Sequence, residues 1–195
     1  MIRLENVSVK YKSEKDEQQA LHNISLNIMQ GECCVLCGKS GCGKTTITRL
    51  INGLIPNFYS ADVEGKILLN NKDTSALDLK EISNFVGSVF QNPKSQFFNT
   101  NTTAELAFGC ENRAWNTKKI LNKMNESTQL FELHDLINRD IFSLSGGEKQ
   151  RVACGAVYAA EPQIFILDEP LSPIYPSSVI VLLALLETME WANQR

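Results

Sequence analysis

The run GKSGCGKT at residues 38–45 limits what this chain can fold into more than any other feature of the sequence. It matches the pattern G-x-x-x-x-G-K-[ST], in which the glycines let the backbone wrap closely around an anion. Successive N–H groups of such a loop point at one phosphate, and the helix that follows adds the positive end of its dipole. The run therefore predicts a phosphate-binding loop, or P-loop, for a nucleoside triphosphate with Mg²⁺.

The segments on either side of the loop supply the context that the pattern requires. Cys33–Cys37 is a short apolar run that predicts a buried strand, and residues 46–54 predict a helix that starts near Lys44 and that Pro56 stops. A chance glycine-rich turn is the alternative that this order of elements disfavours. Lys44 is expected to reach the β- and γ-phosphates, and the Thr45 hydroxyl is expected to ligate Mg²⁺. The predicted triphosphate-binding residues are Gly38, Lys39, Ser40, Gly41, Cys42, Gly43, Lys44, Thr45 and Thr46.

The composition argues against several classes of protein. The 195 residues carry 19 basic and 22 acidic side chains, so the formal charge of −3 disfavours nucleic-acid binding driven by bulk charge. The longest apolar run, at residues 179–186, is far shorter than the roughly 20 residues of a membrane-spanning helix. Cys34 and Cys37 form a C-x-x-C, but no second pair or histidine cluster completes a zinc site. Reduced thiols packed in the core of a cytosolic protein are therefore expected.

The hydrophobic patterns predict an α/β fold with a helical insertion. Residues 1–30 alternate as two strands joined by a charged loop. Further strands are expected at residues 65–69, 85–90 and 164–168. Apolar positions recur at helical spacing within residues 92–149, which we interpret as a small helical subdomain. The apolar stretch at 177–191 predicts one more helix.

A pair of acidic residues follows the last expected strand. Ile164–Asp168 together with Glu169 resembles a Walker B strand, in which an acid at the carboxyl end of a parallel strand points into the ligand crevice. The resemblance implies that Asp168 holds Mg²⁺, directly or through water, and that Glu169 polarises the attacking water as general base. An acidic pair in an ordinary turn is the alternative, which the P-loop in the same chain disfavours.

A second glycine-containing motif, LSGGE at residues 144–148, resembles the signature loop of ATP-binding-cassette (ABC) ATPases. Physically it is a second anion site, because Ser145 and the N–H groups of Gly146 and Gly147 stand at the start of a helix expected to end at Ala160. The resemblance implies that this segment, Glu148 included, closes on the ATP held by a second ABC ATPase subunit, in a homodimer or a heterodimer. A glycine turn that caps a helix without binding a ligand is the alternative.

Two further residues stand where ABC ATPases place functional side chains. Tyr11 follows the first strand, at the position of the aromatic residue that stacks on adenine, although packing at the surface explains it equally well. Gln91 matches the glutamine of the Q-loop, which contacts Mg²⁺ and the attacking water and leads into the helical subdomain. The resemblance therefore implies a catalytic set of Lys44, Gln91 and Glu169, and a Mg²⁺ set of Thr45, Gln91 and Asp168.

Residues 89–98 and 105–109 resemble the ATPases of energy-coupling-factor and cobalt-type importers more specifically. These importers take up vitamins, vitamin precursors and transition-metal ions. The resemblance implies an integral membrane transporter subunit as partner, no nucleic acid, and a peripheral place on the cytoplasmic face of a bacterial cell membrane. Phe97, Phe98 and Phe108 either line the groove that receives the membrane partner or pack inside the helical subdomain.

The sequence departs from the ABC pattern after Pro170. Ile174 and Tyr175 stand where the family has leucine and aspartate. Neither His22 nor His134 occupies the position of the histidine that contacts the γ-phosphate in the family. We therefore expect the chain to be truncated at its C-terminal end relative to the family, without the switch-histidine segment.

The resemblance as a whole implies a P-loop NTPase of RecA-like type. We expect a mostly parallel sheet, an N-terminal antiparallel β-subdomain and an inserted α-helical subdomain, within one ABC ATPase domain over residues 1–195. Residues 1–91 and 150–195 would form the nucleotide-binding core. The first functional hypothesis is an ATP hydrolase that powers an importer. The second is a truncated ATP-binding module with little or no hydrolysis. A soluble ABC protein of DNA repair or translation is disfavoured by the charge balance.

Overall fold

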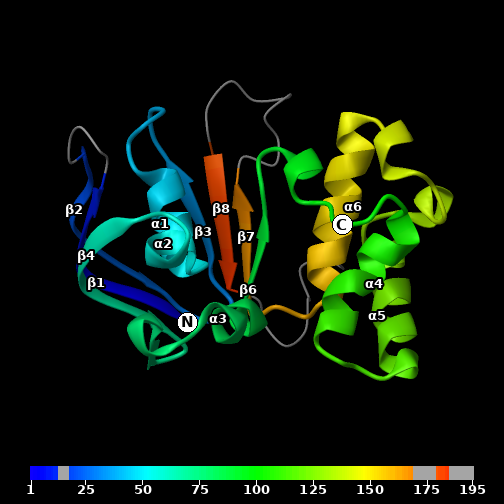
Figure 1. The fold of residues 1–195 in the computed structure, drawn as a ribbon, viewed down its shortest axis with the longest axis horizontal. Helices are drawn as coiled ribbons and strands as arrows, with labels where there is room; N and C mark the ends of the chain where they lie inside the picture. The colour runs from blue at the N-terminus through cyan, green and yellow to red at the C-terminus, as the bar shows by residue number, and fades with distance from the viewer. Residues whose placement is uncertain (13–17, 169–178, 185–195) are drawn as a thin grey trace. The chain divides into compact units, whose positions relative to one another are not determined.

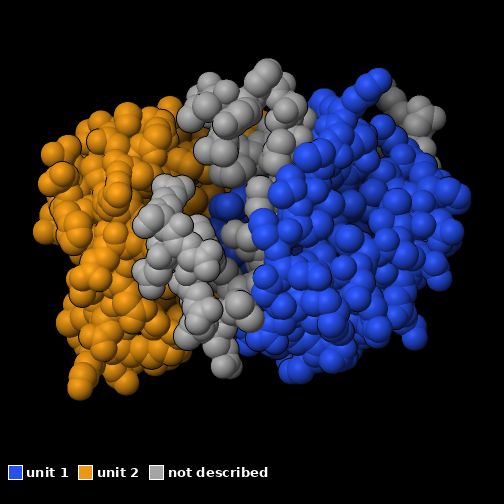
Figure 2. Space-filling view, turned by 180° about the vertical axis from the view of Figure 1, so that it is seen from behind, with its two compact units in different colours: residues 1–88, 163–188 blue, residues 89–162, 189–195 orange. Residues whose placement is uncertain are grey.

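The computed structural model describes residues 1–12 and 18–168 and, for the backbone, 179–184. The chain forms two compact units, which are coloured separately in Figure 2. The first unit consists of residues 1–88 and 163–188, and the second consists of residues 89–162 and 189–195. The chain thus leaves the first unit after Ser88 and returns to it at Gln163.

The first sheet of the first unit is antiparallel and has the strand order β2-β1-β4-β5. Its strands β1, β2 and β4 are labelled in Figure 1. Its central strand β1 pairs antiparallel with both β2 and β4. The bounds are Ile2–Tyr11 for β1, Gln18–Ile28 for β2, Ala61–Leu69 for β4 and Lys72–Asp73 for β5. The predicted pair of N-terminal strands and the antiparallel β-subdomain are therefore confirmed.

The second sheet has the order β3-β8-β7-β6. The bounds are Cys33–Cys37 for β3, Val179–Ala184 for β8, Ile164–Asp168 for β7 and Val86–Val89 for β6. Because β8 runs antiparallel to both β3 and β7, those two strands share one direction, and their carboxyl ends lie at the same edge of the sheet.

The prediction of a helix over residues 177–191 is wrong for residues 179–184, which form β8. A short, wholly apolar run is compatible with a buried strand as well as with a helix, and its periodicity does not distinguish them. The β-branched residues Val179, Ile180 and Val181 favour the strand. Between β3 and β7 the segment gains hydrogen-bonding partners along both of its edges.

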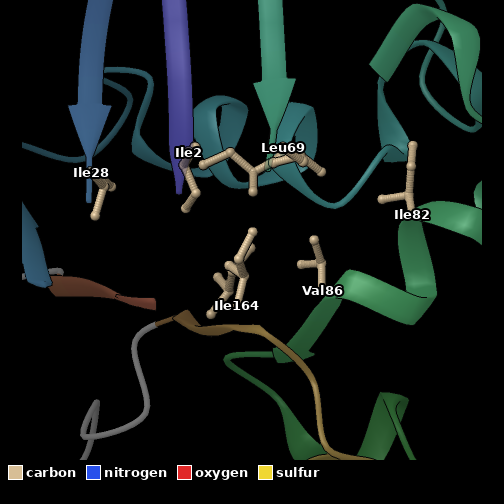
Figure 3. Packing of buried hydrophobic residues seen from close by; sticks show 8 residues of the cluster. Ile2, Ile28, Leu69, Ile82, Val86 and Ile164 are labelled. Atoms are coloured by element: carbon tan, nitrogen blue, oxygen red, sulfur yellow. The ribbon is translucent and has the colours of Figure 1, made fainter. Parts of the chain in front are cut away.

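The core of the first unit lies between the two sheets. In Figure 3 the side chains of Ile2 and Leu69 from the first sheet face those of Ile164 and Val86 from the second. The full cluster of buried residues is Ile2, Ile28, Ile51, Leu69, Ile82, Val86, Ile164 and Ile166. Burial of such apolar side chains is the main favourable term in folding.

Strand β3 is not buried on both faces, contrary to the prediction. Cys33, Val35 and Cys37 alternate as exposed residues along one face of the strand, and Cys42 in the loop is exposed as well. The described cysteines are free thiols, and Cys110 is the one that is fully buried. The prediction that the thiols pack in the core is therefore wrong for Cys33, Cys37 and Cys42, because an apolar run does not reveal whether one face or both faces of a strand are covered.

In the described part of the first unit, three α-helices connect the strands. They are α1 at Lys44–Ile51, α2 at Leu54–Asn57 and α3 at Leu79–Phe85, with a 3₁₀ turn at Thr74–Ala76. The predicted helix after the glycine loop is confirmed as α1, which ends three residues before the predicted end at residue 54. Pro56 lies inside α2.

The second unit is helical within residues 89–162. It extends further than the helical subdomain expected at residues 92–149, because residues 150–162 belong to it and not to the first unit. It contains α4 at Thr102–Asn112, α5 at Thr117–Leu130 and α6 at Gly146–Ala159, with 3₁₀ turns at Pro93–Ser95, His134–Leu136 and Ile141–Ser143. Its core consists of Leu106, Leu133, Leu136, Leu144 and Val152. Side chains cap the three α-helices at Asn101, Asn116 and Ser145.

Candidate functional site

The glycine loop joins the end of β3 to the start of α1, which is the arrangement that the sequence predicts. Gly43 is the last residue before α1 and has a φ of 97°, in the left-handed region that favours glycine. A Cβ at this position would stand 2.6 Å from Cδ2 of Leu21 and 2.9 Å from the carbonyl oxygen of Ala20. The close approach of β2 and the backbone conformation therefore both require glycine at this point.

Lys44 is buried and folds back across the loop that precedes it. Its ammonium donates hydrogen bonds to the carbonyl oxygens of Gly38 at 2.8 Å and Lys39 at 3.0 Å, and it lies 3.7 Å from Sγ of Cys42. These partners are neutral groups, and no carboxylate of the described residues forms an ion pair with Lys44, so within this part of the chain its positive charge is solvated by the loop but not neutralised. An anion entering the loop would supply the missing negative charge.

The N-terminus of α1 differs from those of the other long helices. Among the described helices of seven residues or more, α1 alone begins without a hydrogen bond from a side chain, and its first turn has no acidic residue. Helix N-termini carry unsatisfied N–H groups and a positive partial charge. The loop and α1 together therefore present backbone donors and the ammonium of Lys44 to a phosphate-sized anion.

The two threonines after Lys44 have different surroundings. Thr45 is exposed, as a ligand to a bound metal ion would need to be. Thr46 is buried, and its hydroxyl lies 3.3 Å from the hydroxyl of Tyr11. The Thr46 side chain is thus occupied inside the protein, so it would contribute its backbone N–H to an anion.

Tyr11 at the end of β1 is tied to α1 by its hydroxyl group. Besides Thr46, that hydroxyl accepts a hydrogen bond from the guanidinium of Arg49 at 3.4 Å. The guanidinium also lies 4.0 Å from the centre of the Tyr59 ring, a favourable cation–π distance. The sequence analysis did not predict Arg49 or Tyr59 at this site. The sequence indicates Arg49 only by its place one helical turn after Thr46. These contacts hold the Tyr11 side chain, at the end of β1, against α1.

Asp168 ends β7 at the same edge of the sheet at which β3 leads into the glycine loop. In the register of the sheet, Asp168 and Leu36 are both partners of Ile180 in β8. Strands lie about 4.8 Å apart, so the end of β7 is roughly 10 Å from the end of β3. Glu169, the predicted general base, lies outside the described residues.

Gln91 follows the end of β6 and is exposed. It belongs to the second unit, whereas the glycine loop and Asp168 belong to the first. The prediction that Gln91 contributes to the same Mg²⁺ site therefore stays a prediction.

The predicted signature segment, Leu144–Glu148, forms the start of α6. Ser145 is the N-cap residue, and it exchanges two hydrogen bonds with Glu148 in a capping box. These hydrogen bonds with Ser145 hold the pKa of the Glu148 carboxyl below its usual value. Glu148 therefore serves the segment by closing the cap, and its negative charge does not suit it to contact phosphate directly.

Gly146 and Gly147 are exposed, and a Cβ at either position would meet no atom within 4 Å. Neither glycine is thus required by contacts within the chain, although glycine is a poor helix former. Small residues at an exposed helix start leave room for a ligand to approach the backbone N–H groups. This open surface is what the predicted second anion site needs.

The three phenylalanines of the predicted docking groove have different roles. Phe97 packs against the core of the helical unit. Phe98 is 79% exposed, and its ring is stacked on that of Phe108 at 4.8 Å between ring centres. Glu105, which is buried in α4, accepts hydrogen bonds from the N–H groups of Phe98 at 3.1 Å and Asn99 at 2.8 Å. The packing alternative is therefore confirmed for Phe97, whereas Phe98 remains exposed with its ring on the partly buried Phe108.

No helix among the described residues combines the length and the hydrophobicity needed to cross a membrane.

Comparison with known proteins shows relatives along most of the chain. The family model described as "ABC transporter" matches residues 21–172. An ABC transporter ATP-binding protein of Treponema denticola is 48% identical over 172 residues, which cover 88% of this chain and 35% of the relative. One of Methanosarcina mazei is 37% identical over 189 residues, which cover 97% of this chain and 32% of the relative. The chain thus spans about a third of the length of the curated relatives that it matches.

Solved structures resemble the fold as well. CbiO1 from Clostridium perfringens, part of the ABC transporter complex CbiONQ, superimposes with a TM-score of 0.74 and 28% identity, over 90% of this chain and 67% of that chain. A dimeric ATP-binding cassette in a post-hydrolysis state, bound to ADP and inorganic phosphate, gives a TM-score of 0.74 and 27% identity, over 90% of this chain and 77% of that chain.

Proposed function

This chain belongs to the ABC transporter family, and from that premise we propose that it is the ATP-binding subunit of a membrane importer. In this proposal the chain binds ATP with Mg²⁺ in the glycine loop and hydrolyses it to drive uptake. The observation that carries the proposal is the unneutralised ammonium of Lys44 beside the uncapped N-terminus of α1. Both features suit a triphosphate, whose negative charge the loop otherwise lacks.

The residues present also suit a magnesium ion. Thr45 is exposed directly after Lys44. Asp168 ends β7, which is separated in the sheet only by β8 from β3, the strand that leads into the glycine loop. Hydroxyl, carboxylate and amide oxygens are the ligands that Mg²⁺ prefers, so Thr45, Asp168 and Gln91 are the proposed set. When bound, the ion neutralises charge on the β- and γ-phosphate oxygens.

The catalytic roles follow from the chemistry of phosphoryl transfer, which needs positioning and charge neutralisation. Lys44 exchanges its two carbonyl partners for oxygens of the β- and γ-phosphates. Glu169 accepts a proton from the attacking water through its carboxylate, and Gln91 orients that water. Tyr11 supplies a ring against which adenine stacks.

The signature segment acts on a second subunit in this proposal. Ser145, Gly146 and Gly147 offer a hydroxyl and exposed N–H groups at the start of α6, and they close on the γ-phosphate held by that subunit. The solved relative that is a dimeric cassette with ADP and phosphate supports a paired arrangement. Each ATP site is then shared between two ABC ATPase subunits, identical or different.

The membrane partner and the type of importer rest on the helical unit. The similarity to CbiO1 supports a cobalt-type or energy-coupling-factor importer at the cytoplasmic face of a bacterial membrane, with a vitamin, a vitamin precursor or a metal ion as cargo. The exposed ring of Phe98, which is stacked on the partly buried Phe108, supports a contact with an apolar segment of the integral membrane subunit. The competing function, ATP binding with little hydrolysis, is favoured by Ile174 and Tyr175 in place of the family's leucine and aspartate.

The test is Mg²⁺-dependent phosphate release by the purified protein together with its membrane partner. We expect release that stops when Mg²⁺ is chelated and that Lys44→Ala abolishes together with ATP binding. Lys10→Ala on the exposed side of β1 is the matched control and should retain both activities. Tight ATP binding with hydrolysis at background level would favour the binding module over the ATPase.

A further inference from the structure

One buried charge in the helical unit has no role in the function proposed above. Among the described residues two lysines are buried, Lys44 with 8% and Lys149 with 5% of its surface exposed. Lys149 follows the signature segment in the first turns of α6. Removing an ammonium group from water is costly unless hydrogen bonds or opposite charges compensate it. An apolar residue would fill this position without that cost, so the lysine calls for an explanation.

The partners of Lys149 lie in the signature segment and in the turn before it. Its Nζ donates hydrogen bonds to the carbonyl oxygen of Phe142 at 3.2 Å and to the carbonyl oxygen of Leu144. No carboxylate of the described residues forms an ion pair with it. Lys149 therefore repeats the arrangement of Lys44, in which a buried ammonium reaches back to two carbonyl oxygens of the loop before its own helix.

The hydrogen bonds of Lys149 hold the backbone just before Ser145, whereas Glu148 holds the N–H of Ser145 itself. Asp140 caps the 3₁₀ turn at Ile141–Ser143 by accepting a hydrogen bond from the N–H of Phe142 at 2.7 Å. Lys149 holds the carbonyl oxygens of the same stretch, and Glu148 holds the N–H of Ser145 at 2.7 Å. Because Leu144 and Ser145 share one planar peptide group, the hydrogen bond of Nζ to the carbonyl oxygen of Leu144 also restrains the N–H of Ser145.

The charge of Lys149 also affects any anion at this segment. Glu148 places a negative charge at the same helix start, and it is exposed to solvent that screens its field. Lys149 is buried one peptide group away from Ser145, where screening by solvent is weaker. The buried positive charge therefore counteracts the negative charge of Glu148 for a phosphate that docks on Ser145, Gly146 and Gly147.

We propose that Lys149 is the positioning residue of the signature segment. Its buried ammonium fixes the carbonyl oxygens of Phe142 and Leu144 and supplies positive charge behind Ser145, so that the segment binds the γ-phosphate of the ATP held by the partner subunit. This inference rests on the proposed function of the segment. Lys149 itself touches no reacting atom, and it acts through Ser145 and the two glycines.

The test separates ATP binding from turnover. In Lys149→Met the side chain keeps its approximate length and loses its charge and both hydrogen bonds. We expect the Kd for ATP of the isolated subunit to stay within about twofold, since its own P-loop is intact. With the membrane partner present, kcat should fall roughly tenfold to a hundredfold, as it does when a distant change misplaces a catalytic group. Lys149→Arg, which keeps the charge, should recover part of that loss.

Two companion variants make the result interpretable. Lys118→Met on the exposed face of α5 is the matched control and should keep the wild-type kcat. Ser145→Ala is the benchmark for the segment itself. If Ser145→Ala lowers kcat and Lys149→Met does not, the inference about Lys149 is wrong and the proposed function stands. If Ser145→Ala leaves kcat unchanged, the proposed role of the signature segment is what fails.

If Lys149→Met does not fold, Lys149→Gln tests the same inference. Glutamine keeps two N–H donors for the carbonyl oxygens and has no charge. We expect Lys149→Gln to fold, to bind ATP with the wild-type Kd and to lose kcat. Wild-type kcat in Lys149→Gln would overturn the role of the buried charge.

Discussion

Ser145 and Glu148 cap each other at the start of α6: the N–H of Ser145 donates to Oε2 of Glu148 at 2.7 Å, and the N–H of Glu148 donates to Oγ of Ser145 at 3.3 Å. A hydroxyl can accept and donate at the same time, so Oγ keeps its own hydrogen for another acceptor. The cap therefore leaves the serine able to bind a phosphate oxygen while it holds the helix start in place.

Gly147, next to this cap, gives a prediction in which stability and activity separate. A methyl group there meets no atom of the chain and favours the helix, so Gly147→Ala should leave the free energy of unfolding unchanged or raise it by up to about 1 kcal/mol. In the proposed function, the same methyl group would stand in the path of the phosphate held by the second subunit, so kcat should fall. Urea unfolding and ATPase assays on one preparation check both. A loss of stability together with kcat would contradict the ligand explanation.

At Gly43, in contrast to Gly147, substitution by alanine should lower stability. Its φ of 97° and the short distances to Leu21 and Ala20 mean that Gly43→Ala distorts the glycine loop. We expect a loss of about 1–3 kcal/mol in the free energy of unfolding. The rise in melting temperature on adding ATP should also shrink, since ligand binding stabilises the folded state by mass action. Gly41 also has a positive φ, of 80°, but open space around it, so Gly41→Ala adds backbone strain without a clash and should cost less stability than Gly43→Ala.

Tyr11 can be tested by comparing ligands with and without a base. Tyr11→Phe loses the hydroxyl contacts with Thr46 and Arg49 and keeps the ring, so the Kd for ATP should stay within about twofold and stability should fall by about 0.5–1.5 kcal/mol. Tyr11→Ala should weaken ATP roughly tenfold, because stacking on a base is worth about 1–3 kcal/mol. Binding of tripolyphosphate, which has no base, should not change.

Tyr59 offers the matched control for this comparison. Its ring packs on Arg49, and Tyr59→Ala should leave the affinities for both ligands within about twofold of wild type. Equal losses for ATP and tripolyphosphate in Tyr11→Ala would instead assign Tyr11 to the support of α1.

The sequence could predict the elements that carry strong local signals. The glycine loop, β3 before it and α1 after it follow from a motif whose backbone conformation few residues can adopt. The segment at 179–184 could not be assigned in the same way, because its pairing with β3 and β7 depends on strands far away in the chain.

Side-chain partners were less predictable than elements. Phe97 and Phe98 are neighbours of the same type, yet one packs in the core and the other is exposed. The sequence position of Lys149 is typical of a solvated lysine on a helix. Only the folded turn at Ile141–Ser143 brings the carbonyl oxygen of Phe142 within reach of its ammonium group. Such contacts require tertiary structure, which periodicity does not describe.

Glu105 gives a prediction for the helical unit. One oxygen of its buried carboxylate accepts the N–H groups of Phe98 and Asn99 and the side-chain amide of Asn99. Glu105→Ala leaves these donors without their partner, so the free energy of unfolding should fall by about 2–3 kcal/mol. Because Phe98 then loses its support, stimulation of the ATPase by the proposed membrane partner should fall as well.

The control for Glu105 lies on the same helix. Glu111 is exposed in α4, and Glu111→Ala should change stability by less than about 0.5 kcal/mol and leave the stimulation intact. Stimulation at the wild-type level in a folded Glu105→Ala protein would remove Phe98 from the proposed contact with the membrane partner.

Glu161 predicts how stability depends on pH. Its carboxylate accepts hydrogen bonds from Lys119 at 2.8 Å and Lys123 at 2.7 Å. Partial burial alone would raise the pKa of this carboxyl, but the bonds and charges of the two lysines outweigh that effect and hold the pKa below its usual value of 4.5. A group whose pKa is lowered by folding contributes stability above its usual pKa and loses it as the pH falls through the folded value.

Glu161→Gln removes this contribution. The variant should be less stable than wild type at pH 7, and the two should converge as the pH falls below about 4.5, because wild type then protonates the group that the variant lacks. Urea unfolding between pH 7 and pH 3 measures both curves. Glu132, which is 87% exposed and 3.9 Å from Arg151, is the control, and Glu132→Gln should follow wild type throughout. If the curve of Glu161→Gln runs parallel to that of wild type across this range, the two lysines do not lower the pKa of Glu161.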